Sequence, residues 1–224
     1  MSPDFGHPTP DTSPDQPIIF VIDDDASVRT SLSRLLTAMG FRTETFGSAE
    51  DFLTRKRHEG VGCLILDVRM PGLTGVDLQD ELARADYSIP IVFITGHGDI
   101  PMGVNAIKKG AIDFIPKPFD DEQLLNAVKS AIEKHRQERK LQAERNDILR
   151  RVKLLSPREY EIFQSIITGK LNKQIGYSLN IAEKTVKVHR GRVMEKLEVN
   201  SVAELVRLAE KAGIKPSGRT ASEQ

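Results

Sequence analysis

The chain has 224 residues, of which 39% are hydrophobic and 29% charged, a composition typical of a globular protein with room for two domains. It contains no run of about 18 apolar residues, and its first residues lack the basic and apolar regions of a signal peptide, so neither a membrane span nor secretion is expected. The single cysteine, Cys63, cannot form an internal disulfide. These features favour a cytoplasmic protein.

The charge is unevenly distributed, although the net charge is zero. Residues 18–132 hold 12 Lys and Arg against 17 Asp and Glu, whereas residues 133–224 hold 20 against 12. Such asymmetry suggests a basic module that meets nucleic acid, with a solvated basic helix as the alternative. Residues 1–17 are rich in proline and poor in apolar side chains, so we expect a disordered tail there.

Strand and helix patterns alternate through residues 18–132. Apolar or alternating runs predict five strands, at residues 18–22, 41–46, 63–67, 89–95 and 111–115. Helical patterns separate them, and a last helix starts near Glu122 with Asp120 or Asp121 as its cap. This order predicts an α/β doubly wound, five-stranded parallel sheet of strand order 2-1-3-4-5, covered by helices on both faces.

The second half is predicted to be helical throughout. Residues 133–152 are highly charged, and they are either a solvated connecting helix or a weak coiled-coil seam between two copies. Four short helices are then predicted at 156–168, 173–179, 183–197 and 201–212, with Asn172 capping the second. A short helix, a tight turn at 180–182 and a longer basic helix form a helix-turn-helix signature. We assign residues 153–214 to this all-α domain and 215–224 to a flexible tail.

Polar side chains stand at the ends of the predicted strands. Asp23 and Asp24 follow the first strand, Asp67 and Thr95 end the third and fourth, and Lys117 follows the fifth. Ligands of a doubly wound sheet bind beyond the carboxyl ends of its strands, so these groups should share one crevice. Three crowded carboxylates need a cation, and oxygen ligands favour Mg²⁺. Asp67 is predicted to accept a phosphoryl group, and Lys117 and the Thr95 hydroxyl could bind its remaining oxygens.

Over about residues 18–132 the chain resembles the receiver domain of two-component response regulators. The resemblance is carried by Ile22–Asp25, Leu66–Gly72, Ile94–Asp99 and Lys117–Phe119. It implies that Asp67 takes a phosphoryl group from a phosphohistidine of a sensor histidine kinase.

The same resemblance implies roles for the surrounding residues. Mg²⁺ would be bound by Asp24, Asp67 and the backbone carbonyl of Arg69, with Asp23 acting through water. Thr95 and Lys117 would bind phosphoryl oxygens, and the Lys117–Pro118 bond would be cis. Phe114 stands where the family couples an aromatic residue to Thr95, but it lacks the hydroxyl of a Tyr.

The helix predicted at 183–197 has one core-facing and one outward-facing side. Its core side should carry Val186, Val193 and Leu197. On the other side Val188 could contact a thymine methyl, and Thr185 and Lys187 could reach base edges. The remaining candidate DNA contacts are phosphate-binding Lys184, Arg190 and Arg192, a packing or phosphate-contacting His189, and Lys173 on the preceding helix.

The second half resembles the LuxR-type helix-turn-helix. The resemblance is carried by Leu155–Glu159, Asn172–Ile175 and Lys184–His189, and with His97–Met102 it points to the FixJ branch of the FixJ/NarL regulators. Two residues depart from the pattern. Ala182 replaces the usual Ser and implies a weaker helix cap, and Gly103 replaces a common Ala and implies a less rigid helix in the receiver.

These observations predict a transcription regulator, not an enzyme. Phosphorylation of Asp67 would draw Thr95 and Lys117 inward, repack Phe114 and remodel the surface around residues 101–125. That change would favour a homodimer, release the DNA-binding module, or both, with double-stranded DNA and RNA polymerase as partners and no membrane.

Three alternatives remain open. One is a regulator that binds DNA without phosphorylation. Another is a Mg²⁺-dependent, haloacid-dehalogenase-like phosphatase, which needs an acidic group two residues after the nucleophile, where Arg69 stands. A nucleotide-binding enzyme is the third, although no glycine-rich phosphate loop follows the first strand.

Overall fold

The computed structural model describes residues 16–96 and 100–216, so most of both predicted tails and the segment 97–99 lie outside the described residues. Contacts divide the chain into two compact units, one up to Arg139 and one from Lys140 onward. Each unit is described by itself below. None of the helices in these ranges is long and apolar enough to cross a membrane.

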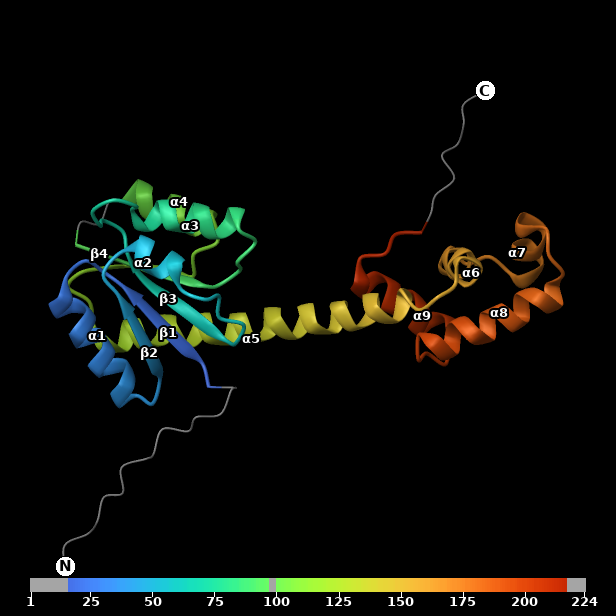
Figure 1. The fold of residues 1–224 in the computed structure, drawn as a ribbon, viewed down its shortest axis with the longest axis horizontal. Helices are drawn as coiled ribbons and strands as arrows, with labels where there is room; N and C mark the ends of the chain where they lie inside the picture. Colours follow the sequence, from blue (N-terminus) through green and yellow to red (C-terminus); the bar gives the residue numbers. More distant parts are fainter. Residues whose placement is uncertain (1–15, 97–99, 217–224) are drawn as a thin grey trace, which may run out of the picture. The chain divides into compact units, whose positions relative to one another are not determined.

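The first unit is built on the predicted parallel sheet (Figure 1). Its strand order is β2-β1-β3-β4-β5, as the sequence indicated. The strands are β1 (Ile18–Ile22), β2 (Arg42–Phe46), β3 (Gly62–Asp67), β4 (Ile91–Thr95) and β5 (Asp113–Pro116).

Strands β4 and β5 each begin two residues later than predicted, and local hydrogen bonding explains both differences. Strand β4 begins at Ile91 and not at residue 89, because Pro90 has no N–H for the ladder, although its carbonyl accepts from the Leu64 N–H at 2.8 Å. Strand β5 begins at Asp113 and not at residue 111, because the Ala111 N–H is used by the Ala106 carbonyl at the end of the preceding helix.

Helices cover both faces of the sheet, which gives the unit two apolar cores. The helices are α1 (Ala26–Ala38), α2 (Ala49–Thr54), α3 (Gly75–Arg84), α4 (Ile100–Lys108) and α5 (Asp121–Val152). One core packs Phe20, Leu64 and Phe93 against α2, α3 and α4. The other packs Ile65 and neighbouring strand residues against α1 and α5. Side chains alternate across each strand, so nearly continuous apolar strands can fill both cores.

Helix α5 continues beyond the first unit. The charged stretch 133–152, predicted as a solvated connecting helix or a coiled-coil seam, is part of one helix of 32 residues (Figure 1). Val128 and Ala131 belong to a core of the first unit, and Ile148 and Val152 belong to the core of the second. The structure therefore joins the two units by unbroken helical backbone.

The second unit contains the four predicted helices, α6 (Pro157–Ile167), α7 (Asn172–Leu179), α8 (Glu183–Lys196) and α9 (Val202–Ala212). Ser156 and Glu159 form the predicted capping box at the start of α6. In the turn between α7 and α8, Asn180 adopts a left-handed conformation with φ 51°. Gly176 makes the close approach possible, because a Cβ there would lie 2.8 Å from the Ile181 carbonyl oxygen.

The prediction that Asn172 caps α7 is wrong. Leu171 occupies the cap position, and the Gln174 side chain accepts from the Leu171 N–H at 2.9 Å. The Asn172 side-chain oxygen instead accepts from the Arg190 guanidinium on α8 at 3.0 Å. A hydrogen bond from a charged donor is stronger than a neutral cap, which accounts for the exchange of partners.

A partly buried ion pair joins the end of α8 to the first turn of α6. Lys196 Nζ, at the end of α8, donates to Glu159 Oε2 at 2.6 Å and to the Leu154 carbonyl at 3.1 Å. Glu159 is only 3% exposed. The bond from Lys196, followed by the Ser156 N–H, lowers the pKa of Glu159 to about 2.

Replacing Glu159 with Gln should destabilise the second unit. The loss should be roughly 1 kcal/mol, because Lys196 is partly exposed and solvent screens the pair. The contribution of the Glu159 carboxylate to the free energy of unfolding is complete above the ordinary pKa of a Glu side chain. It decreases as the pH falls towards the lowered pKa of about 2. Chemical unfolding of Glu159→Gln at neutral and at acidic pH would measure this. Glu195→Gln, on the exposed side of α8, is the matched control, and equal losses in both variants would contradict the assignment.

Candidate functional site

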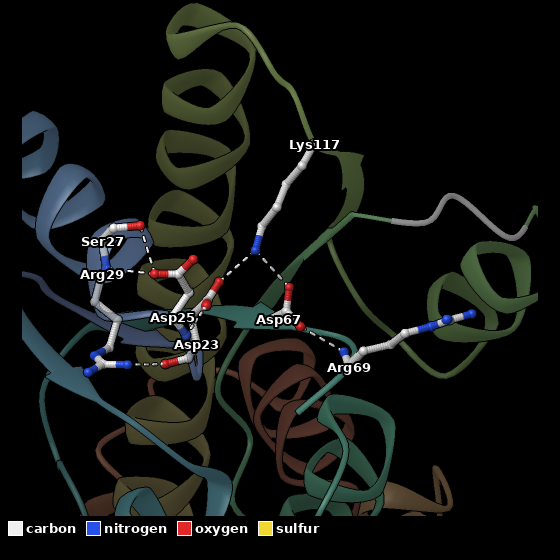
Figure 2. A network of polar contacts seen from close by, with 7 residues as sticks. All are labelled: Asp23, Asp25, Ser27, Arg29, Asp67, Arg69 and Lys117. Atoms are coloured by element: carbon white, nitrogen blue, oxygen red, sulfur yellow. Dashed lines mark hydrogen bonds and ion pairs between the residues drawn. The ribbon is translucent and has the colours of Figure 1, made fainter. Parts of the chain in front are cut away.

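One lysine holds two carboxylates together at the carboxyl ends of the central strands. In the register, Ile22 of β1 lies beside Leu66 of β3, which brings Asp23 and Asp67 to the same edge of the sheet. Lys117 Nζ, which follows β5, donates to Asp23 Oδ2 at 2.7 Å and to Asp67 Oδ1 at 2.8 Å (Figure 2). Both carboxylates are buried, with 1% and 5% of their surface exposed. The predicted convergence of these three residues is confirmed.

Backbone N–H groups fix the other carboxylate oxygens. The Asp25 N–H donates to Asp23 Oδ1 at 2.8 Å, and the Arg69 N–H donates to Asp67 Oδ2 at 2.7 Å (Figure 2). One oxygen of Asp67 therefore accepts from the loop after β3, and the other accepts from Lys117. Gly75 lets α3 begin directly against this strand end, because a Cβ there would collide with the Asp67 carbonyl oxygen. Sequence reasoning missed Gly75, since nothing in its spacing signals that contact.

The electrostatics of this cluster favour additional positive charge. Burial raises the pKa of Asp67, and the hydrogen bond from Lys117 opposes this effect without cancelling it. Burial alone would lower the pKa of Lys117, but its hydrogen bonds to Asp23 and Asp67 outweigh burial and raise it. Two buried carboxylates and one ammonium carry a formal charge of −1, so the cluster attracts a cation.

Two of the three predicted carboxylates, those of Asp23 and Asp67, meet at Lys117. The third, Asp24, is exposed in the bend directly after β1. No three Asp, Glu, His or Cys side chains within residues 16–96 and 100–216 are arranged to hold a metal ion. Asp25 is committed elsewhere, because its side chain caps α1 through the Ser27 N–H at 2.7 Å.

Thr95 and the peptide bond after Lys117 lie where the sequence placed them. Thr95 ends β4 and is 1% exposed, and its carbonyl accepts from the Lys117 N–H at 2.6 Å. The Lys117–Pro118 bond is cis, as expected. Strand β4 thus carries Thr95 to the edge that holds Asp67 and Lys117.

Phe114 occupies space that a glycine leaves open. Its ring is half-buried on β5 and lies 6.3 Å from the Phe93 ring, at an interplanar angle of 48°. A Cβ on Gly103 of α4 would lie 3.0 Å from Phe114 Cδ1. The sequence had suggested only that Gly103 loosens its helix, whereas the structure shows that it seats the Phe114 ring.

Helix α8 presents most of the predicted DNA contacts to solvent. Val186, Val193 and Leu197 are fully buried, which confirms the predicted core side. Val188 is 50% exposed although it is apolar. The exposed polar candidates are Lys184, Thr185, Lys187 and Arg192 on α8 and Lys173 on α7.

Two of the predicted DNA contacts are less exposed to solvent. His189 and Arg190 are half-buried, and Arg190 is engaged by Asn172, which joins α8 to α7. Ala182, at the start of α8, provides no side-chain cap, as its replacement of Ser implied.

The two units correspond to two known protein families. Residues 19–129 match the response regulator receiver domain, and residues 153–209 match the luxR family of bacterial regulatory proteins. The chain is 43% identical over 196 residues to the transcriptional regulatory protein FixJ of Bradyrhizobium diazoefficiens, an alignment that covers 88% of this chain and 96% of that protein. The chain belongs to the FixJ-like two-component response regulators.

Other relatives align with this response regulator over most of their length. It is 47% identical over 197 residues to nodulation protein W of the same organism, covering 88% of this chain and 87% of that protein. The solved structure of the response regulator StyR is 48% identical, with a TM-score of 0.78 over 88% of this chain and 99% of that one. Full-length FixJ from B. japonicum has a TM-score of 0.51 at 43% identity, over 88% of this chain.

Removing the positive charge of Lys117 should destabilise this response regulator most at neutral pH. Lys117→Met leaves two buried carboxylates in mutual repulsion, which should cost about 2–3 kcal/mol at pH 7. The loss should shrink as the pH falls, because the carboxylates then take up protons. Thermal unfolding between about pH 5 and pH 8 measures this. Lys109→Met, which breaks a pair with the exposed Asp80, should change little, and a pH-independent loss in Lys117→Met would contradict the interpretation.

Proposed function

We propose that Asp67 is the phosphoacceptor of this response regulator and that its phosphorylation controls DNA binding. The observation that carries the proposal is the placement of Asp67 at the end of β3, with Lys117 Nζ 2.8 Å from Oδ1. An Asp67 oxygen would attack the phosphorus of a phosphohistidine on a sensor histidine kinase, and the N–P bond to histidine would break. Lys117 would remain beside the new phosphoryl oxygens and neutralise part of their charge.

The cluster also suits Mg²⁺ by the chemistry of its donors. The carboxylates of Asp23 and Asp67 and the backbone carbonyl of Arg69 are hard oxygen ligands, and Mg²⁺ usually keeps several waters besides one or two carboxylates. Asp24, whose side chain is exposed beside Asp23, would be the direct carboxylate ligand besides Asp67. Asp23 would act through water, because its two oxygens accept from Lys117 Nζ and from a backbone N–H. The ion would neutralise carboxylate charge and hold a phosphoryl oxygen.

The residues around Asp67 offer a route from phosphorylation to a change of surface. A phosphoryl group places new acceptors near Lys117 and the Thr95 end of β4, and Phe114 lies between β5 and α4. Movement of Phe114 against Gly103 would displace α4, which exposes the apolar side chains of Val104 and Ile107. We propose that this surface, within residues 101–125, favours a homodimer or releases the DNA-binding unit.

The helix-turn-helix unit would then read a roughly palindromic DNA site in two copies. Helix α8 would enter the major groove with Val188, Thr185 and Lys187 towards the bases. The surrounding lysines and arginines, Lys173, Lys184, Arg190 and Arg192, would lie at phosphates, and His189 beside them. A cytoplasmic location and contact with RNA polymerase complete the proposal for a transcription regulator that is not itself an enzyme.

Asp67→Asn tests the central claim. The variant should lose the increase in DNA affinity and in dimer formation that a small-molecule phosphodonor produces in the natural chain, because an amide cannot accept the phosphoryl group. Fluorescence anisotropy with target DNA and light scattering give the two readouts. Asp86→Asn is the matched control, at an exposed turn with φ 50° that Asn tolerates. An undiminished phosphodonor response in Asp67→Asn would contradict the role of Asp67. The absence of any phosphodonor effect in the natural chain would support a regulator that binds DNA without phosphorylation.

Single substitutions on α8 should separate base contacts from phosphate contacts. Lys184→Ala should weaken binding to all sequences and reduce the salt slope by about 1, as expected when one phosphate contact is lost. Val188→Ala should instead lower affinity for the specific site, by roughly 1 kcal/mol, and leave the salt slope unchanged. Lys129→Ala removes a positive charge from an exposed site on α5 of the receiver and serves as control. Equal effects of Lys184→Ala and Lys129→Ala would contradict the assignment.

A further inference from the structure

A histidine lies at the point where α5 leaves the first unit. His135 is 4% exposed, and the next buried residue along α5 is Ile148, in the core of the second unit. Between them, in a stretch that is described throughout, every side chain is exposed or half-buried. His135 is therefore the last buried side chain of α5 before this helix continues to the DNA-binding unit (Figure 1).

The imidazole contacts the backbone of the strand that carries Asp67. Its Nδ1 lies 2.8 Å from the Gly62 carbonyl oxygen and 3.1 Å from the Gly62 nitrogen. A neutral ring can donate to the carbonyl or accept from the N–H, depending on its tautomer. Gly62 is the first residue of β3, and Asp67 is the last. The connecting helix and the phosphoacceptor thus contact opposite ends of one central strand.

The surroundings disfavour a charge on this ring. Burial lowers the pKa of His135; the bond to Gly62 opposes that effect, and the positive charge of Arg139 adds to it. The titratable and charged groups that face the ring are Arg139 and Glu138 on α5 and His58 on the loop before β3. His58 contacts the adjacent backbone, with Nε2 3.3 Å from the Val61 carbonyl, and burial lowers its pKa as well. Arg139 and His58 therefore disfavour a positive charge on His135, and Glu138 is the acidic group that acts on this ring in the opposite direction.

We propose that His135 is a proton-sensitive anchor that holds the connecting helix on the receiver. With a neutral ring, the turn of α5 around His135 is docked on Gly62. Protonation places a second positive charge beside Arg139, at a buried position. The hydrogen bond that Nδ1 still donates to the Gly62 carbonyl does not offset the cost of burying this charge, so the turn is released. Transmission from the receiver to the DNA-binding unit then weakens. This last step rests on the proposed function, whereas the anchor itself does not.

The direction of the pH effect follows from linkage. The docked ring binds a proton less readily than a released ring, whose pKa is about 6.5. Docking is therefore unaffected above that value, and it loses stability as the pH falls below it. The equilibrium constant for release should rise between pH 6.5 and pH 5.5, by at most about fivefold.

Hydrogen exchange in the full-length chain tests the anchor. Protection factors of the amides at residues 133–139, corrected for the intrinsic pH dependence of exchange, should fall between pH 6.5 and pH 5.5, by up to about fivefold. In His135→Gln, which can still hydrogen-bond to Gly62 but cannot take up a proton, they should stay constant. In His58→Gln the fall should persist. A fall that survives in His135→Gln, or that disappears in His58→Gln, overturns the proposal.

Titration of the natural chain tests whether protonation of His135 releases this turn of α5, even if His135→Gln does not fold. The His135 ring, followed by NMR, should become protonated over the same pH range in which residues 133–139 lose protection. Protonation without loss of protection overturns the proposal.

A second readout concerns transmission. The ratio of DNA affinities with and without a phosphodonor should fall on acidification in the natural chain and stay constant in His135→Gln. A ratio of one at every pH would refute the proposed function, and the exchange result would still decide the anchor. A phosphorylation response with the same pH dependence in both chains would overturn the transmission step.

Discussion

The bridge from Lys117 to Asp23 and Asp67 is the constraint on which the receiver depends. Two carboxylates at adjacent strand ends can be buried only if a positive charge neutralises part of their negative charge. Lys117 reaches both because β5 and the loop after it end at the same edge as β1 and β3. The remaining carboxylate oxygens are held by backbone N–H groups of the loops that follow these strands. The fold thereby prepares a negative site in which a phosphoryl group and a cation can be accommodated together.

The same strand connects this site with the rest of the chain. Strand β3 lies in the middle of the sheet, is buried along its whole length, and ends in Asp67. Its other end, Gly62, contacts His135 of the helix that continues into the second unit. On the opposite side of the site, Phe114 fits against α4 because residue 103 has no side chain. Phosphorylation therefore has two structural routes outward, one through α4 and one through α5.

In the second unit, polar contacts between helices fix the orientation of α8. Lys196 binds Glu159 and the Leu154 carbonyl at the end of the helix, and Arg190 binds Asn172 of α7 nearer its start. The core side chains of α8 are few, so these contacts supplement a narrow apolar face. Because α8 is held in this way, its exposed lysines and Val188 form a surface of defined shape, as readout of DNA requires.

The sequence by itself determined the class of the fold, the strand order, the helix-turn-helix and the family. Apolar runs that each end in a polar residue are a local signal, and they were sufficient to gather Asp23, Asp67, Thr95 and Lys117 at one edge. Tertiary structure alone decided which acidic residue binds Lys117. Asp23 and Asp24 are chemically equivalent neighbours, and the structure buries Asp23 against Lys117 and leaves Asp24 exposed. It also decided that Asn172 binds Arg190, that Gly103 seats Phe114, and that His135 meets Gly62. These contacts join residues that lie apart in the chain, and no periodicity or spacing reports them.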